Sequence, residues 1–379
     1  MSALSRHQHA LGQLKARGRY RQLLPRGGVD FSSNDYLGLA ASGLMRDIAK
    51  AALERGVPVG AGGSRLLRGN TSEHELLEDE ASRFFGTEAT LFMGGGFNAN
   101  MAIFSTLPQQ GDLVLYDALI HASTHDGMRL GRAECRSFTH SDPTSCEEEI
   151  AAWRKDGGTG QIWIAVEALY SMDGDIAPLS ALASLAENTD AILVIDEAHS
   201  TGLFGEQGRG LGAALAGLPN VLSLHTCGKA LGASGALICG QRILIETLIN
   251  KARSFIYATA PSPLNAALVR GALEAVQQRP ELRKSAWDNI HQAWREADRF
   301  CGLSGFESQI LPVVIGEDKR TMQIAFDLQK AGYDIRGIRP PTVPRGTSRL
   351  RISITPNADG NAITKVFQDL APHLQEVAA

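Results

Sequence analysis

The residue types that could do chemistry gather in the middle of this sequence. Residues 191–195 are a short apolar, β-branched run that ends at Asp196, and His199 follows three residues later. A second apolar run, residues 221–224, ends shortly before Lys229. Short buried runs are typical of parallel strands, and open α/β sheets bind ligands at the carboxyl ends of their strands. We therefore expect an acid, an imidazole and an amine to face one crevice.

This set of side chains suits pyridoxal 5'-phosphate. The cofactor forms a Schiff base with a lysine, here Lys229, and pairs its pyridinium nitrogen with a carboxylate, here Asp196. His199 would stack on the ring or bond its phenolic oxygen. Taken singly, a strand-end Asp is more often a cap or turn residue, and a lone Gly-Lys is usually a solvated lysine. Asp-Glu-Ala-His also occurs in nucleotide hydrolases, but these need a phosphate loop that the chain lacks, since its only Gly-Lys follows the acid.

A glycine loop forms a second candidate site. Residues 94–100, Gly-Gly-Gly-Phe-Asn-Ala-Asn, follow a strand-like run and lead into a helical pattern. This order is typical of loops that hold phosphate on backbone N–H groups at a helix N-terminus. A plain tight turn is the alternative interpretation. The other glycine-rich stretch, residues 60–69, does not match a dinucleotide fingerprint.

Composition limits the classes of protein to which the chain can belong. Its 379 residues, 44% hydrophobic and 21% charged, suffice for two domains with sizeable cores. A net charge of −4 gives no electrostatic argument for nucleic acid or a membrane surface. No apolar run approaches the roughly 20 residues of a membrane span. Five cysteines without a Cys-x-x-Cys pair indicate neither a metal site nor a disulfide framework and favour a cytoplasmic location.

The pattern of apolar runs predicts an α/β fold. Helical patterns alternate with seven strand-like runs: 89–93, 113–116, 135–138, 161–168, 191–195, 221–225 and 235–239. This alternation predicts a large domain with a mainly parallel seven-stranded sheet. After residue 240 the mix of long helices and short strands predicts a smaller α+β C-terminal domain. We expect an N-terminal helix and substrate-contacting segment over 1–38, the large domain over 39–270 and the small domain over 271–379.

Two helices are predicted in more detail. Residues 1–29 contain no acid, which faintly resembles a transit peptide, but we favour a surface helix over 3–24. A second helix is expected over 71–86, where Thr71 or Ser72 can cap and Glu75 would complete a capping box.

Together the motifs resemble those of the α-oxoamine synthases, fold-type-I pyridoxal-phosphate transferases that condense an amino acid with an acyl thioester and release carbon dioxide. The matching stretches cover nearly the whole chain in the family's order. They are Ser33-Asn-Asp-Tyr-Leu-Gly-Leu39, residues 94–100, His121-Ala-Ser, Ser171-Met-Asp-Gly-Asp, Asp196-Glu-Ala-His-Ser-Thr-Gly, Thr226-Cys-Gly-Lys and Pro341-Thr-Val-Pro-Arg-Gly-Thr-Ser-Arg-Leu-Arg351.

Within the family, Ile-Arg-Pro-Pro-Thr-Val-Pro and Ser-Phe-Thr-His-Ser-Asp are most similar to members that join L-alanine to pimeloyl-CoA or pimeloyl-acyl-carrier protein in biotin biosynthesis. Two departures keep other substrates open. Gly95 stands where many members have Ser before Gly-Phe, and Gly-Arg-Tyr-Arg21 resembles the 5-aminolevulinate members. The alternatives are therefore an acyltransferase for 5-aminolevulinate or 2-amino-3-ketobutyrate, or a non-catalytic pyridoxal-phosphate-binding protein on the same fold.

The resemblance implies a role for each matching residue. Lys229 would form the Schiff base and move protons at Cα, and His121 would stack on the ring and donate to the acyl carbonyl. The cofactor would be bound by Gly96, Phe97, His121, Ser171, Asp196, His199, Thr226, Thr259 and Lys229. Substrates would be bound by Arg21, Asn34, His121, Arg339, Thr342 and Arg351, with Arg17 and Arg19 as competitors of Arg21. The resemblance also implies a homodimer with shared active sites and no metal.

Overall fold

The computed structural model describes residues 3–23 and 25–375, which fold into two compact units. The sheet unit comprises Asn34–Ser171 and Asp175–Ser285. The terminal unit comprises Met1–Ser33, Met172–Gly174 and Ala286–Ala379, as far as these are described. The domain boundaries at residues 38 and 270 stay a prediction. Composition gave no sign that three residues in the middle of the chain belong with its ends.

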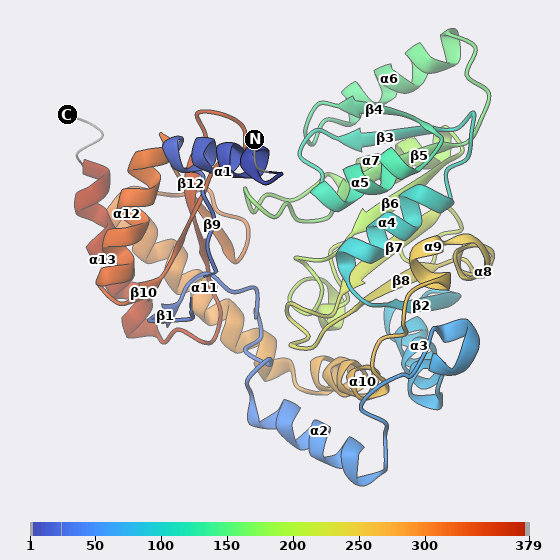
Figure 1. Cartoon of the computed structure of the whole chain (residues 1–379), viewed down its shortest axis with the longest axis horizontal. Helices are drawn as coiled ribbons and strands as arrows, with labels where there is room; N and C mark the ends of the chain where they lie inside the picture. The colour runs from blue at the N-terminus through green and yellow to red at the C-terminus, as the bar shows by residue number, and fades with distance from the viewer. Residues whose placement is uncertain (1–2, 24, 376–379) are drawn as a thin grey trace. The chain divides into compact units, whose positions relative to one another are not determined.

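The sheet unit is built on a seven-stranded sheet with the order β2–β8–β7–β6–β5–β3–β4 (Figure 1). The strands are β2 Ala89–Met93, β3 Leu113–Asp117, β4 Glu134–Phe138, β5 Ile162–Glu167, β6 Ala191–Asp196, β7 Val221–Thr226 and β8 Ala236–Gly240. β8 runs opposite to the other six strands, so the pairs β2–β8 and β7–β8 are antiparallel and the remaining pairs are parallel. The predicted mainly parallel sheet is therefore confirmed, and each strand lies on a strand-like run identified in the sequence.

Side-chain caps and prolines start several helices of the sheet unit. Asp142 accepts N–H groups ahead of a proline in α6, and Ser262 does the same in α10. Thr71 caps α3 as expected, but His74 closes the capping box in place of Glu75, because His74 occupies the third helical position. The helices are α2 Gly43–Glu54, η1 Arg65–Gly69, α3 Ser72–Phe85, α4 Gly96–Thr106, α5 Ala122–Leu130, α6 Pro143–Lys155, α7 Leu179–Asn188, η2 Glu206–Gly208, α8 Arg242–Lys251, α9 Arg253–Ile256 and α10 Pro263–Gln278.

Alternate residues of the central strands β3, β5, β6 and β7 face two separate apolar cores. On β5, Trp163 and Ala165 face a core that also includes residues of α4, α5, α8 and α9. Ile162, Ile164 and Val166 face the other core, to which α6 and α7 contribute. A strand that is buried on both faces has a continuous apolar sequence. This explains why the strands could be found from their sequence as short unbroken runs.

The terminal unit is the predicted smaller α+β part. Its antiparallel sheet has the order β11–β12–β9, and β1 pairs in parallel with β10. The elements are α1 Ser5–Ala16, β1 Val29–Asp30, α11 Pro280–Cys301, β9 Ile310–Gly316, α12 Asp318–Lys330, β10 Tyr333–Asp334, β11 Arg336–Ile338, β12 Ser348–Ser353 and α13 Gly360–Gln375. The first residues of α11 still belong to the sheet unit.

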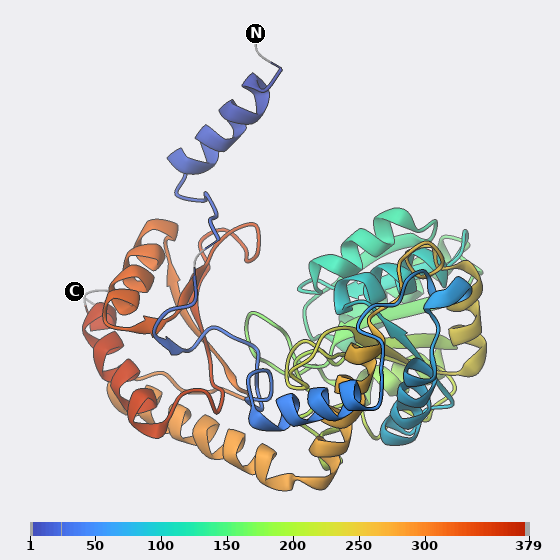
Figure 2. The same ribbon diagram turned by 60° about the horizontal axis from the view of Figure 1, so that its bottom comes forward.

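The N-terminal helix is shorter than predicted. Figure 2 shows the N-terminal end of α1 projecting from the terminal unit, and none of its residues is buried, although Leu11 and Leu14 line a cavity with residues 337–342. The helix ends at Ala16, close to Gly18, whose φ of +64° favours glycine. The prediction of a helix as far as residue 24 is therefore wrong at its C-terminal end, and residue 24 itself lies outside the described residues.

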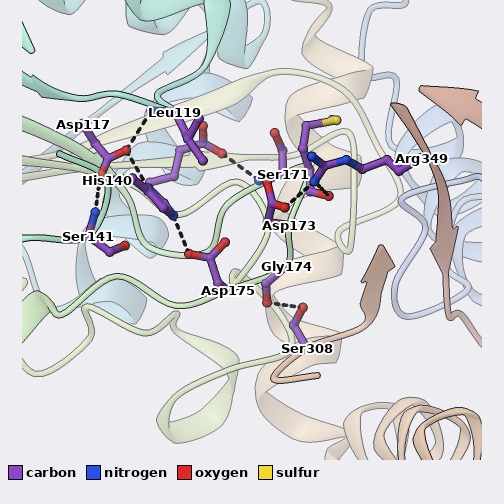
Figure 3. A network of polar contacts seen from close by, with 12 residues as sticks. Asp117, Leu119, His140, Ser141, Ser171, Asp173, Gly174, Asp175, Ser308 and Arg349 are labelled. Carbon is purple, nitrogen blue, oxygen red and sulfur yellow. Dashed lines mark hydrogen bonds and ion pairs between the residues drawn. The ribbon is translucent and has the colours of Figure 1, made fainter. Parts of the chain in front are cut away.

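A buried ion pair holds Met172–Gly174 in the terminal unit. Arg349 of β12, whose side chain is 4% exposed, pairs with Asp173 (Figure 3). The carbonyl of Gly174 accepts a hydrogen bond of 2.7 Å from the Ser308 hydroxyl. Gly174 has a φ of +73°, a left-handed conformation that other residues rarely adopt. These contacts explain why three residues separate from their neighbours in sequence.

The first prediction concerns this ion pair. Asp173→Ala should lower the free energy of unfolding by roughly 2 to 4 kcal/mol, because it leaves the Arg349 guanidinium buried without its carboxylate. The lower part of the usual range applies, since Asp173 is itself 36% exposed. Urea denaturation measures the change. The control is Glu54→Ala, which breaks an exposed pair with Lys50 and should cost less than about 0.5 kcal/mol. Equal losses in the two variants would contradict the assignment.

Candidate active site

A cavity of about 380 Å³ in the sheet unit gathers residues from one edge of the sheet. The loop after β2 contributes Gly94–Phe97, and the segment after β3 contributes His121. Glu167 and Asp196 come from the last positions of β5 and β6. The remaining lining residues are Asn34, Asn100, Ser123, Ala198, His199, Thr226, Gly228, Lys229, Ser234 and Gly235. The ends of neighbouring strands thus meet at one cavity, as the sequence predicted.

Lys229 begins a chain of polar contacts. Its Nζ lies 2.7 Å from His199 Nε2, and His199 Nδ1 lies 2.6 Å from the Tyr36 hydroxyl. That hydroxyl donates a hydrogen bond of 2.9 Å to Asn34 Oδ1. Because the Tyr36 proton is used in this bond, His199 Nδ1 must donate to Tyr36, and Nε2 is left to accept from Lys229. The contacts hold the imidazole in one tautomer beside the amine.

Asp196 is fixed by donors on both carboxylate oxygens. Asn100 Nδ2, from the first turns of α4, donates to Oδ2 over 2.8 Å. The backbone N–H of Ala198 donates to Oδ1 over 2.9 Å. The side chain is buried, at 7% exposure, yet it still lines the cavity. These bonds set the plane of a carboxylate that faces any bound ligand.

Glu167 lies directly beside Asp196 in the sheet. The two residues are register partners in the parallel pair β5–β6. Glu167 Oε2 accepts the N–H of Ser171 over 3.2 Å, whereas Oε1 is buried and has no hydrogen-bond partner among the described residues. Burial raises the pKa of Glu167 above its ordinary value of 4.5, Asp196 raises it further, and Lys229 acts in the opposite direction. The wall of the cavity therefore contains a carboxyl group that favours its protonated form.

His121 caps α5 and presents its ring to the cavity. The backbone N–H of Ser123 donates to its Nδ1 over 3.2 Å, so a neutral ring carries its proton on Nε2. Burial lowers the pKa of His121; Lys229 lowers it as well, while Asp196 raises it. Phe97 stands edge-on to the imidazole, with ring centroids 6.5 Å apart. The geometry gives a neutral imidazole with an N–H donor at Nε2.

The backbone of the glycine loop lies close to Thr226, which also lines the cavity. A Cβ added to Gly96 would lie 2.5 Å from Thr226 Cγ2, so no larger residue fits there without movement. Gly96 is also the first residue of α4, whose unpaired N–H groups start at this end. A helix N-terminus that opens at a cavity favours a phosphate or another anion.

Four predicted substrate-binding residues belong to the terminal unit. Arg21, Arg339 and Thr342 line a separate cavity of about 380 Å³ there, and Arg21 donates to Thr342 Oγ1 over 3.3 Å. Arg17 and Arg19 line the same cavity, and Arg19 forms a 2.8 Å ion pair with Asp318. Arg351 is buried in β12 and donates to the Ser353 hydroxyl over 2.7 Å.

The structure brings eight of the predicted residues to the first cavity: Asn34, Gly96, Phe97, His121, Asp196, His199, Thr226 and Lys229. Ser171 and Thr259 are not among its lining residues, although Ser171 reaches Glu167 through its backbone. The functional roles of all these residues stay predictions.

Sequence reasoning missed Glu167, Asn100 and Tyr36 as individual site residues. Signals for them existed. Glu167 ends a strand as Asp196 does, and Asn100 lies four residues after Gly96, one turn along the same helix face. Over the described ranges, no helix is long and apolar enough to cross a membrane, and no cluster of three His, Cys, Asp or Glu is placed to bind a metal ion.

Comparisons with known proteins agree with this geometry. The model of the family "aminotransferase class I and II" matches residues 26–370. An 8-amino-7-oxononanoate synthase of Hydrogenovibrio crunogenus is 38% identical over 90% of this chain and 86% of its own. One from Chromobacterium violaceum is 41% identical over 86% of this chain and 84% of its own. These relatives confirm the resemblance predicted from the sequence.

A solved structure of serine palmitoyltransferase from S. paucimobilis, described as containing bound PLP, superposes over 100% of both chains. Its TM-score is 0.89, and the sequences are 24% identical. At that identity the likeness shows the fold, which confirms the predicted fold class.

The second prediction concerns the pH dependence of Glu167. The raised pKa means that the folded state keeps a proton which the unfolded state loses, so stability falls as the pH rises above 4.5. Glu197, whose pKa burial raises to about 7, acts in the same direction. The free energy of unfolding of Glu167→Gln should therefore rise relative to that of the wild type. The difference should grow by up to about 1.4 kcal/mol for each pH unit above 4.5, as long as Glu167 of the folded wild type stays protonated.

The measurement is urea denaturation of the cofactor-free protein between pH 5 and 8. Glu54→Gln, at an exposed position, is the control and should follow the wild-type curve. Parallel curves for Glu167→Gln and the wild type would show that Glu167 is ionised in the fold.

Proposed function

Because the chain belongs to the aminotransferase class I and II family, we propose that it catalyses the reaction for which its 8-amino-7-oxononanoate synthase relatives are named. In this proposal it uses pyridoxal phosphate to condense L-alanine with a pimeloyl thioester in biotin biosynthesis. The products are 8-amino-7-oxononanoate, carbon dioxide and the free thiol of coenzyme A or an acyl-carrier protein. The cytoplasmic location expected from the sequence remains a prediction.

One observation carries the proposal. Lys229 and Asp196 come from the ends of the neighbouring strands β7 and β6 and line one cavity with the glycine loop at the start of α4. The donor set fits pyridoxal phosphate, which needs an amine, a carboxylate and a phosphate site. Lys229 would hold the carbonyl carbon, Asp196 the ring nitrogen, and the first turn of α4 would offer N–H groups to an anion. When bound, the cofactor supplies a protonated ring that draws electrons from a breaking bond at Cα.

The chain's own groups would supply the proton transfers. The Lys229 amine would take a proton from the Cα of alanine, and His199 beside it would keep that amine oriented. The N–H at His121 Nε2 would face the acyl carbonyl as its oxygen gains negative charge. Asn34, held by Tyr36, would bind the amino-acid carboxylate. Arg351, Arg21, Arg339 and Thr342 of the terminal unit would bind the carboxylate of alanine and the acyl substrate.

The third prediction tests the reaction itself. The purified protein with pyridoxal phosphate, L-alanine and pimeloyl-CoA should release free thiol and yield a product with the mass of 8-amino-7-oxononanoate. Glycine or serine, and succinyl, acetyl or palmitoyl thioesters, should give much slower release. Lys229→Ala is the control and should lose the visible absorbance of the bound cofactor together with turnover. Faster turnover of glycine with succinyl-CoA or acetyl-CoA would replace the proposed substrates by those of a sister enzyme.

We further propose that two copies of the chain share their active sites. The large side chains of Leu67 and Tyr257 are 81% and 72% exposed. Their two segments lie together, because Ala260 N–H donates to Gly63 O over 2.9 Å. An apolar surface of this kind suits a second copy of the chain, and Thr259 would then reach the partner's cofactor.

The fourth prediction follows from this sharing. Lys229→Ala and Thr259→Val should each be inactive alone. When the two are mixed, dissociated and reassembled, about a quarter of the sites should be intact, because half of the dimers are mixed and each has one complete site. Turnover of the reassembled mixture measures this. If activity does not return while mixed dimers form, the sites are not shared.

A further inference from the structure

His140 lies between two carboxylates, and its ring carries a positive charge when both carboxylates are ionised. Its Nδ1 is 2.8 Å from Asp117 Oδ1, and its Nε2 is 2.8 Å from Asp175 Oδ2 (Figure 3). Ionised carboxylates only accept hydrogen bonds, so both ring nitrogens have to donate. Asp117 cannot be the protonated partner, because its oxygens also accept the N–H groups of Leu119 and Ser141.

The pKa values agree with this geometry. Burial lowers the pKa of His140, but the bonds to Asp117 and Asp175 outweigh it and raise the pKa to about 10. Burial raises the pKa of Asp117, but the hydrogen bonds from His140, Ser141 and Leu119 outweigh it and hold that pKa below its ordinary value. The Tyr170 ring packs edge-on against the imidazole, with centroids 4.5 Å apart. The charged ring is therefore fixed on several sides.

Asp175, which His140 contacts, lies at the base of a closed turn. Tyr170 N–H donates to Asp175 O over 3.0 Å, and Leu169 forms a β-bridge with Ile176. The turn between them runs from Ser171 to Gly174. Asp175 Oδ1 is buried and has no hydrogen-bond partner among the described residues, whereas Oδ2 is bonded to His140.

The other end of the same turn reaches the candidate active site. Ser171 N–H donates to Glu167 Oε2, and Glu167 lines the cavity with its Oε1 unpaired. A carboxyl group can rotate about its terminal bond, so the single bond from Ser171 decides which oxygen faces the cavity. Displacement of the turn would release this orientation.

We propose that His140 is a positioning residue: by holding Asp175 at the base of the turn, it keeps Ser171 placed to donate to Glu167 and so fixes how the Glu167 carboxyl faces the cofactor cavity. His140 belongs to the stretch Ser-Phe-Thr-His-Ser-Asp. In this stretch Asp142 caps the start of α6, and His140 contacts Asp117 at the end of β3. The inference rests on the proposed function in one respect, that the cavity binds pyridoxal phosphate.

The fifth prediction is a double-mutant cycle between the turn and Glu167. Asp175→Asn removes the charge that His140 holds, while its amide oxygen can still accept one hydrogen bond. It should raise the dissociation constant for pyridoxal phosphate roughly fivefold, which is the scale of one hydrogen bond. It should also shift the pH midpoint of the visible band of the bound cofactor. In a Glu167→Ala background the same change should alter the dissociation constant by less than about twofold, because its target is gone. His140→Gln should repeat both results.

Arg270→Gln is the matched control, since it breaks a partly buried ion pair with Glu73 (3.1 Å) between α10 and α3. It should lower the melting temperature and leave both cofactor readouts unchanged. Additive effects of Asp175→Asn and Glu167→Ala, or an equal effect of Arg270→Gln, would overturn the positioning role while the proposed function stands. If the wild type develops no visible band with pyridoxal phosphate, the proposed function itself fails, which is a distinct result.

Discussion

The candidate site depends on the in-register pairing of β5 and β6, which sets Glu167 beside Asp196 at one edge of the sheet. Two neighbouring carboxyl groups in a buried wall cannot both be charged without a large cost. The structure gives them unequal partners: two donors face Asp196, whereas Glu167 receives one N–H from Ser171. The proton of the pair is thus better placed on Glu167. In the proposed function Asp196 would face the cation while Glu167 keeps its proton, a division of roles that many active sites use.

Other buried acids at this edge are stabilised by partners of different kinds. Asp117 at the end of β3 has the charged ring of His140. Glu197, next to Asp196, accepts the Ser200 hydroxyl and the backbone N–H groups of residues 211 and 212. Each partner set ties a loop behind the cavity to the end of a strand. Because a buried charge without its partner is costly, these loops are constrained by the same groups that make the edge acidic.

The sequence predicted which residues lie at the strand ends better than it predicted the contacts between residues distant in the sequence. The buried strands, Asp196 and Lys229 could be identified because an apolar run and the polar residue after it are local features, whereas β4 is mostly exposed and was found as a strand-like run without this signal. Glu167 and Asn100 could not be assigned, since their importance comes from register and from helix placement. The sequence also could not predict that Met172–Gly174 belong to the terminal unit, because their place depends on Arg349, which is 176 residues away from Asp173. Roles that the family resemblance implied for Ser171 and Thr259 likewise depend on contacts that no local pattern contains.

Two histidines show how far side-chain chemistry is decided by such distant partners. His225 in β7 lies between the hydroxyls of Thr201 and Ser223, at 2.8 and 2.9 Å, and burial lowers its pKa to about 3. Hydroxyls can donate as well as accept, so a neutral ring satisfies both contacts and no charge is buried. The carboxylates around His140 can only accept, so the same side chain is charged there. A sequence shows both residues as isolated histidines near strand ends. Only the residues that the fold brings against them decide that His225 is buried as a neutral ring and that His140 holds a turn near the candidate active site.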